Sequence, residues 1–253
     1  MSANLRVDSS SCSSAAQIEA VLGGLQTLLQ DEIRQIQPVA APEEPDALPR
    51  LQAVAKHFPS FFGLLVEPWL EEIAEEPVRQ ILEECARLHL YARILDDALD
   101  ENQPVHRCNL LRAQPMFWRA THRLAVQAPE LERETTALIT ETVQAVRHDD
   151  DSPQALCWGP KNHHLPLAPL LLSRNSPAYQ ACRAGLSALI ALVQAGDEWR
   201  QGVLHRDSVQ GDFLAQIPAL VDTRHLMTLR THGWVSAAER MVLEARQLIT
   251  VLQ

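Results

Sequence analysis

The sequence predicts an all-α protein, and three observations support that prediction. Only nine of the 253 residues are glycine, too few for the glycine-rich loops and tight hairpins of nucleotide-binding α/β folds or β proteins. Good helix formers dominate the composition, above all leucine, alanine, glutamine, glutamate and arginine. Apolar residues recur at helical spacing between proline-containing breaks, and no stretch alternates with the period of two that is typical of strands.

The beginning of the chain separates into a tail, a helix and a linker. Residues 1–16 are serine-rich with no apolar segment, which predicts a disordered tail, and residues 17–253 predict a single helical domain. A first helix is expected at about 16–35, where apolar residues follow helical spacing. The proline-rich segment 37–45 then predicts a linker.

Prolines and polar breaks define the later helices. A second helix is expected at about 47–56, with a break at Pro59, and residues 61–74 are apolar and helical. The remaining helices are expected at about 77–101, 108–127, 130–148, 164–173, 177–204, 211–229 and 234–252.

Charge, apolar runs and cysteines exclude several classes of protein. The formal net charge is −10, from 32 acidic and 22 basic residues, whereas nucleic-acid binding requires a dense basic surface. The serine-rich N-terminal residues do not resemble a secretory signal, and no run of about 18 apolar residues exists, so we expect neither a secretory signal nor a transmembrane segment. The five cysteines are scattered and form no Cys-x-x-Cys pair, which indicates reduced thiols in a cytoplasmic protein.

An acidic cluster at the end of the helix expected at 77–101 is the strongest functional signal. Asp96, Asp97 and Asp100 are spaced so that their carboxylates share one helix face, where like charges repel. Acids at a helix C-terminus also oppose the helix dipole, so a purely structural role is disfavoured. Oxygen ligands clustered on a rigid element suit Mg²⁺, which usually also holds water and substrate phosphates. A solvated helix end remains the alternative.

Two further features lie downstream. The apolar helix expected at 177–204 carries Asp197 and Glu198 near its end, with Gln201 one turn later, and Arg206 follows. Lys161 lies 36 residues before Asp197, in an otherwise apolar approach to a helix, and a lysine is a good partner for phosphate. Taken alone, the first feature is an ordinary helix end and the second is a polar helix N-terminus.

Together, these motifs resemble those of the class I isoprenoid synthase superfamily. Asp96-Asp97-Ala-Leu-Asp100 resembles the first aspartate-rich motif, DDxxD, and Asp197-Glu198-Trp-Arg-Gln201 is similar to the second acidic motif of trans-isoprenyl diphosphate synthases. Lys161 matches the lysine between the two motifs. Lys56 lies about 40 residues before Asp96, where chain-elongating members carry a Gly-Gly-Lys-Arg segment that is absent here.

The resemblance implies a single-domain antiparallel helical bundle around an apolar cavity. It implies a prenyl diphosphate substrate and three Mg²⁺ ions that bind with the diphosphate, whose departure they assist by neutralising charge. Asp96, Asp97 and Lys161 would be the catalytic residues, and Lys161, Arg107 and Arg206 would contact the diphosphate. The implied metal ligands are Asp96, Asp97, Asp100, Asp197, Glu198 and Gln201.

Three interpretations remain open. The first is a Mg²⁺-dependent enzyme that ionises an allylic prenyl diphosphate and then couples or cyclises the carbocation. The second is a non-catalytic prenyl-diphosphate-binding or regulatory subunit of the same fold, favoured by Gln201 in place of the usual aspartate. The third is a helical interaction protein in which the motifs arise by chance. A homodimer is compatible with each of them.

Overall fold

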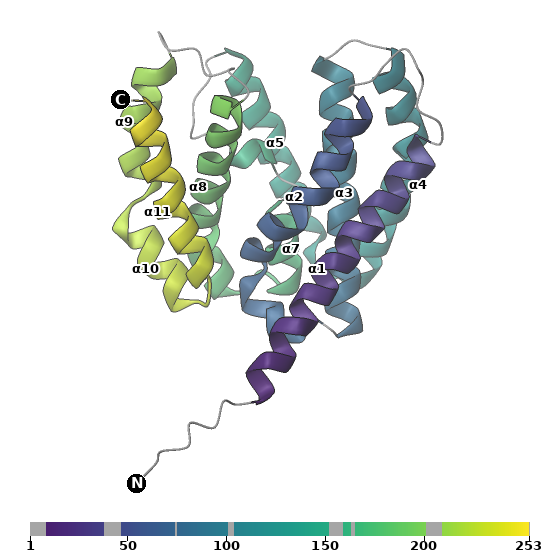
Figure 1. Cartoon of the computed structure of the whole chain (residues 1–253), viewed down its shortest axis with the longest axis horizontal. Coiled ribbons are helices and arrows are strands. Elements are labelled where there is room, and N and C mark those ends of the chain that lie inside the picture. The colour runs from purple at the N-terminus through teal and green to yellow at the C-terminus, as the bar shows by residue number, and fades with distance from the viewer. Residues whose placement is uncertain are drawn as a thin grey trace. The chain divides into compact units, whose positions relative to one another are not determined.

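The computed structural model describes residues 9–37, 47–73, 75–100, 104–151, 159–162, 165–200 and 209–252. Every regular element in these ranges is helical, so the all-α prediction is confirmed (Figure 1). Within the same ranges, no helix combines the length and the hydropathy that crossing a bilayer requires. The α-helices are α1 (Ser9–Ile36), α2 (Ala47–Leu65), α3 (Glu76–Asp100), α4 (Pro104–Gln127), α5 (Glu132–Asp151), α7 (Leu167–Leu172), α8 (Pro177–Arg200), α9 (Val209–Leu220), α10 (Thr223–Thr231) and α11 (Val235–Leu252), and the 3₁₀ helices are η1 (Glu67–Glu72), η2 (Pro129–Leu131) and η3 (Pro160–Asn162).

Backbone contacts divide the chain into two compact units. The first unit comprises Met1–Gly63 and Trp69–Trp118, and the second comprises Leu64–Pro68 and Arg119–Gln253. Residues 1–8 of the expected tail lie outside the described residues, and α1 begins at Ser9, seven residues before the expected start.

In the first unit, α1 packs against α3. The buried residues of α1 recur every three or four positions, as an amphipathic helix requires, and the buried residues of α3 do the same. They are Leu25, Leu29, Ile33 and Ile36 on α1, and Ile81, Leu82, Cys85, Ala86, Leu90 and Ile94 on α3.

The expected break at Pro59 is wrong, because α2 continues through this proline to Leu65. A proline inside a helix removes one hydrogen bond and costs about 3 kcal/mol. Here the buried face of α2 runs through the proline, since Ala55, Phe58 and Phe62 are all buried. The rings of Phe58 and Phe62 stack at a centroid distance of 4.7 Å. We infer that burial of this face offsets the missing hydrogen bond.

In the second unit, α8 packs against α10 and α11, and these two helices also contact each other (Figure 1). The start of α11 is held by residues from the end of α2 and the beginning of η1. The Trp234 indole Nε1 donates a 2.8 Å hydrogen bond to the Leu65 carbonyl. The Glu67 carboxylate accepts hydrogen bonds from the backbone N–H groups of Ser236 and Ala237, so it caps α11 and favours its N-terminal dipole.

The single helix expected at 211–229 is also wrong, because this region forms two helices, α9 and α10. Asp222 lies between them and caps α10, since its carboxylate accepts a 2.8 Å hydrogen bond from the Arg224 N–H. Aspartate is a strong N-cap residue, so the sequence itself carries a signal for the boundary between α9 and α10.

Candidate functional site

The first acidic motif forms the last turns of α3. Asp97 is turned toward the protein and is only 6% exposed, whereas the neighbouring Asp96 faces solvent. Asp100 ends the same helix, and its side chain lies outside the described residues. The helix before the motif is anchored by buried Leu90 and Ile94, so the two described carboxylates project from a rigid element.

Two arginines contact these carboxylates. Arg93 of α3 lies one turn before the motif, with its Nη1 atom 2.7 Å from Asp96 Oδ2 and its Nη2 atom 3.8 Å from Asp97 Oδ1. Arg50 of α2 approaches from another helix, with Nη1 4.0 Å from Asp97 Oδ1. Both arginine side chains remain well exposed. The resulting site contains two carboxylates and two guanidinium groups within one unit.

The buried carboxylate of Asp97 is not fully compensated by its cationic neighbours. Burial raises its pKa above the usual aspartate value, and the charge of Asp96 acts in the same direction. Arg93, the buried His106 and Arg50 lower it, but their combined effect is smaller than that of burial and Asp96 together. An additional cation of higher charge would therefore stabilise the ionised form of Asp97. On this ground the donor set fits a divalent metal ion with hard oxygen ligands.

Sequence reasoning missed Arg50, Arg93 and His106. The contact of Arg93 could have been found, because it lies three and four residues before the two aspartates, on the same helix face. Arg50 and His106 belong to α2 and α4, and no pattern within α3 indicates that they approach it. The proposed phosphate ligand Arg107 follows His106 on α4 and is exposed. Lys56 is exposed on α2.

The second acidic motif is described in part. Asp197 lies in the last turn of α8, is half-exposed and forms an ion pair with Arg200. The side chain of Glu198 and residues Gln201 and Arg206 lie outside the described residues. The backbone of α8 approaches α11 here, because a Cβ atom placed on Gly196 would lie 3.2 Å from Glu244 Oε2.

An open pocket of about 460 Å³ borders this end of α8. Trp199 and Arg200 line it from α8, and the buried Glu244 lines it from α11. The Glu244 carboxylate forms an ion pair with Arg240, one turn earlier on α11. The pocket therefore combines apolar surface with charges of both signs.

Lys161 lies on η3, in a segment that is tied to two helices of the second unit. The Thr142 hydroxyl of α5 donates a 2.9 Å hydrogen bond to the Pro160 carbonyl. Gly159 lies so close to α8 that a Cβ atom there would collide with the side chain and backbone of Ser187. Asp197 lies ten residues beyond this contact, about 15 Å further along α8.

The first acidic motif thus belongs to the first unit, and Lys161 and Asp197 belong to the second. Among the residues that the structure describes, no group of three or more histidine, cysteine, aspartate or glutamate side chains is arranged to hold a metal ion. Comparison of the chain with known protein families, with curated proteins and with solved structures finds no match.

Proposed function

We propose that the chain is a Mg²⁺-dependent enzyme that ionises an allylic prenyl diphosphate and then couples or cyclises the carbocation. The observation that carries the proposal is the site at the end of α3, where Asp96 and Asp97 lie beside Arg50 and Arg93. A magnesium diphosphate needs oxygen ligands for the metal and cationic donors for the phosphate oxygens. This site offers both, and the order of the acidic motifs and Lys161 along the chain agrees with the same chemistry.

The chain's own residues would act by exchanging partners. Asp96 and Asp97 pair with arginines in the described structure, and the longer of these contacts are 3.8 and 4.0 Å. When the carboxylates bind metal instead, Arg93 and Arg50 become able to donate hydrogen bonds to the diphosphate, a group with which guanidinium forms bidentate pairs. Bound Mg²⁺ would supply Lewis-acid neutralisation of the charge that develops on the leaving diphosphate.

The alternative function is a non-catalytic prenyl-diphosphate-binding subunit. It is favoured by the arginine pairing of both described aspartates and by Gln201, which replaces a carboxylate with a neutral amide. Such a subunit would bind the prenyl diphosphate through Arg50 and Arg93 without cleaving the bond between the diphosphate and the prenyl chain.

Turnover and binding separate the two functions. The protein is incubated with Mg²⁺ and geranyl, farnesyl or geranylgeranyl diphosphate, with and without isopentenyl diphosphate, and pyrophosphate and organic products are assayed. Release without isopentenyl diphosphate supports cyclisation, and release only in its presence supports coupling. Absence of turnover together with Mg²⁺-dependent thermal stabilisation by the diphosphate supports the binding subunit. At about 100 times Kd the stabilisation is expected to be about 5–10 °C. Absence of both effects contradicts both proposals.

A matched control tests the assignment of the site. Asp96→Asn and Asp97→Asn are expected to abolish turnover and Mg²⁺-dependent stabilisation. Asp31→Asn changes an exposed aspartate of α1 that pairs with Arg34 at 2.6 Å, so it removes a similar surface ion pair outside the site. This control is expected to leave both readouts unchanged.

A further inference from the structure

Helix α4 differs in charge from the rest of the chain. Its 24 residues include four arginines and no acidic residue, although the whole chain carries a net charge of −10. Apolar side chains on the same helix are exposed to solvent, among them Leu111, which is 71% exposed, and Trp118, which is 66% exposed. Exposed apolar side chains that gather on one helix face mark a binding surface, whereas singly scattered ones do not.

The exposed residues of α4 form two rows. Leu111, Pro115 and Trp118 follow the spacing of one helix face, and all three are exposed. Arg112, Arg119 and Arg123 are exposed too, and they lie roughly 100° around the helix axis from Leu111. An apolar row beside a cationic row makes α4 an amphipathic helix whose exposed side is basic and apolar.

We propose that this side of α4 docks on the surface of an anionic phospholipid bilayer. Helices that lie in the membrane interface combine exposed tryptophan and leucine with a polar face rich in lysine or arginine. The rows supply both halves of that interaction: Leu111 and Trp118 enter the boundary between headgroups and acyl chains, while the arginines contact lipid phosphates. The proposal does not depend on the proposed enzymatic function.

Charge favours this occupant over a second copy of the chain on the same face. An antiparallel two-fold contact through the apolar rows of two α4 helices would bring their arginine rows toward each other, where like charges repel. A lipid surface of opposite charge attracts the arginines, and each contributes roughly a fivefold gain in affinity near an anionic membrane.

The primary experiment is co-sedimentation of the full chain with vesicles. Phosphatidylcholine vesicles are compared with vesicles that also contain about 30% phosphatidylglycerol, at low salt and at about 0.5 M NaCl. We expect binding to the anionic vesicles only, weakened strongly by salt. Absence of binding to anionic vesicles, or equal binding to both compositions, overturns the proposal.

Variants identify the surface that binds. Arg112→Gln/Arg119→Gln is expected to lower vesicle affinity about 30-fold, and Leu111→Ser/Trp118→Ser at least about tenfold. The control on α10 combines Arg224→Gln with Met227→Ser, which removes an arginine whose side chain is 91% exposed and an apolar side chain that is 64% exposed. An equal loss in the control overturns the assignment to α4. Circular dichroism melting of each variant shows that it is folded.

Two further readouts keep the proposal independent of any folding defect. Brominated lipids are expected to quench tryptophan fluorescence in the wild type, and the quenching is expected to fall sharply in Trp118→Phe while binding is retained. Unchanged quenching in this variant overturns the proposal. Light scattering without vesicles tests the protein alternative: self-association that is lost in Leu111→Ser/Trp118→Ser would show that the face binds protein instead.

Discussion

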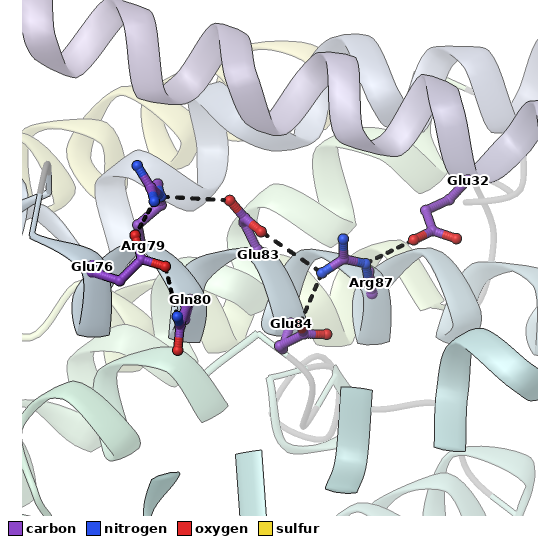
Figure 2. Close-up of polar contacts among 7 residues, drawn as sticks. All are labelled: Glu32, Glu76, Arg79, Gln80, Glu83, Glu84 and Arg87. Atoms are coloured by element: carbon purple, nitrogen blue, oxygen red, sulfur yellow. Dashed lines mark hydrogen bonds and ion pairs between the residues drawn. The ribbon is translucent and has the colours of Figure 1, made fainter. Parts of the chain in front are cut away.

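Two of the ionic clusters on helix α3 differ in how closely their members are held. In the first cluster, Arg87 lies 2.8 Å from Glu32 of α1 and 2.9 Å from Glu84, and all three side chains are almost fully buried (Figure 2). In the second, Arg93 and Arg50 contact Asp97 at 3.8 and 4.0 Å. The Arg93 side chain is 39% exposed, whereas that of Arg87 is 9% exposed.

The difference in burial and contact distance indicates that the Arg87 cluster is structural, whereas the ion pairs around Asp97 can exchange partners. The contacts of Arg87 with Glu32 and Glu84 join α1 to α3 and are short and buried, so these three residues cannot change partners without exposing buried charge. The guanidinium groups of Arg93 and Arg50 lie 3.8 and 4.0 Å from Asp97 and are partly solvated, so another cation can displace them from Asp97 at a lower cost. Two charge clusters on one helix can therefore serve stability and binding, according to their burial.

The largest expected effect comes from breaking the buried cluster of Arg87, Glu32 and Glu84. Arg87→Met would leave Glu32 and Glu84 buried without their cation, and we expect the free energy of unfolding to fall by about 3–5 kcal/mol in urea titrations. Adding Glu32→Gln and Glu84→Gln to this variant is expected to recover most of the loss. Failure of this recovery would mean that packing of the arginine stem, not charge, stabilises the contact.

His89, between the two clusters along α3, provides a pH test. Burial lowers its pKa to about 3, helped by the charge of Arg93, and its ring stacks on Phe58 at 4.0 Å. In the unfolded chain His89 protonates near pH 6.5, whereas in the folded chain it stays neutral at that pH. Its contribution to the free energy of unfolding is therefore full above pH 6.5 and is lost as pH falls below it. The expected slope is about 1.4 kcal/mol per pH unit. His89→Phe, which can keep the stack, is expected to flatten this slope in melts between about pH 6.5 and 5; an unchanged slope assigns it to other groups.

The pH dependence of stability at Asp97, in the second cluster, is expected to have the opposite sign. The pKa of Asp97 is raised chiefly by burial, so its ionisation opposes folding as pH rises from 3.8, the ordinary aspartate pKa, through the higher pKa of the folded state. Asp97→Asn is therefore expected to leave the free energy of unfolding unchanged or raise it by up to about 1 kcal/mol near pH 7. The same variant is expected to lose Mg²⁺-dependent stabilisation. A large fall in melting temperature would assign Asp97 to the structural class of Arg87.

The smallest effect is expected at the beginning of α3, where a third set of contacts is exposed. Arg79 pairs with Glu76 and lies 3.8 Å from Glu83, and both Arg79 and Glu76 are well solvated (Figure 2). Arg79→Gln is expected to change the free energy of unfolding by less than about 0.5 kcal/mol, because exposed ion pairs contribute little. A change as large as that of Arg87→Met would show that burial does not set the ranking.

The sequence predicts the helices with strong periodicity and misses features that depend on packing. The α3 and α11 helices lie within two residues of the expected ranges. The continuation of α2 through Pro59 depends on a buried face formed with distant residues, which local breaking signals do not report. The site follows the same rule. The aspartates and Arg93 share one helix, whereas Arg50 and His106 reach Asp97 only because the chain folds around α3.

The close approach of Gly159 to α8 has a consequence for how this chain tolerates variation. Because any side chain at position 159 would have to displace the backbone of Ser187, replacement by alanine would already separate the Lys161 segment from α8. In a library of random substitutions selected for folding, position 159 should remain almost invariant, whereas Gly23 and Gly24, which have open space around them, should accept many residues. The scarce glycines of this chain would thus differ sharply in how freely they can be replaced.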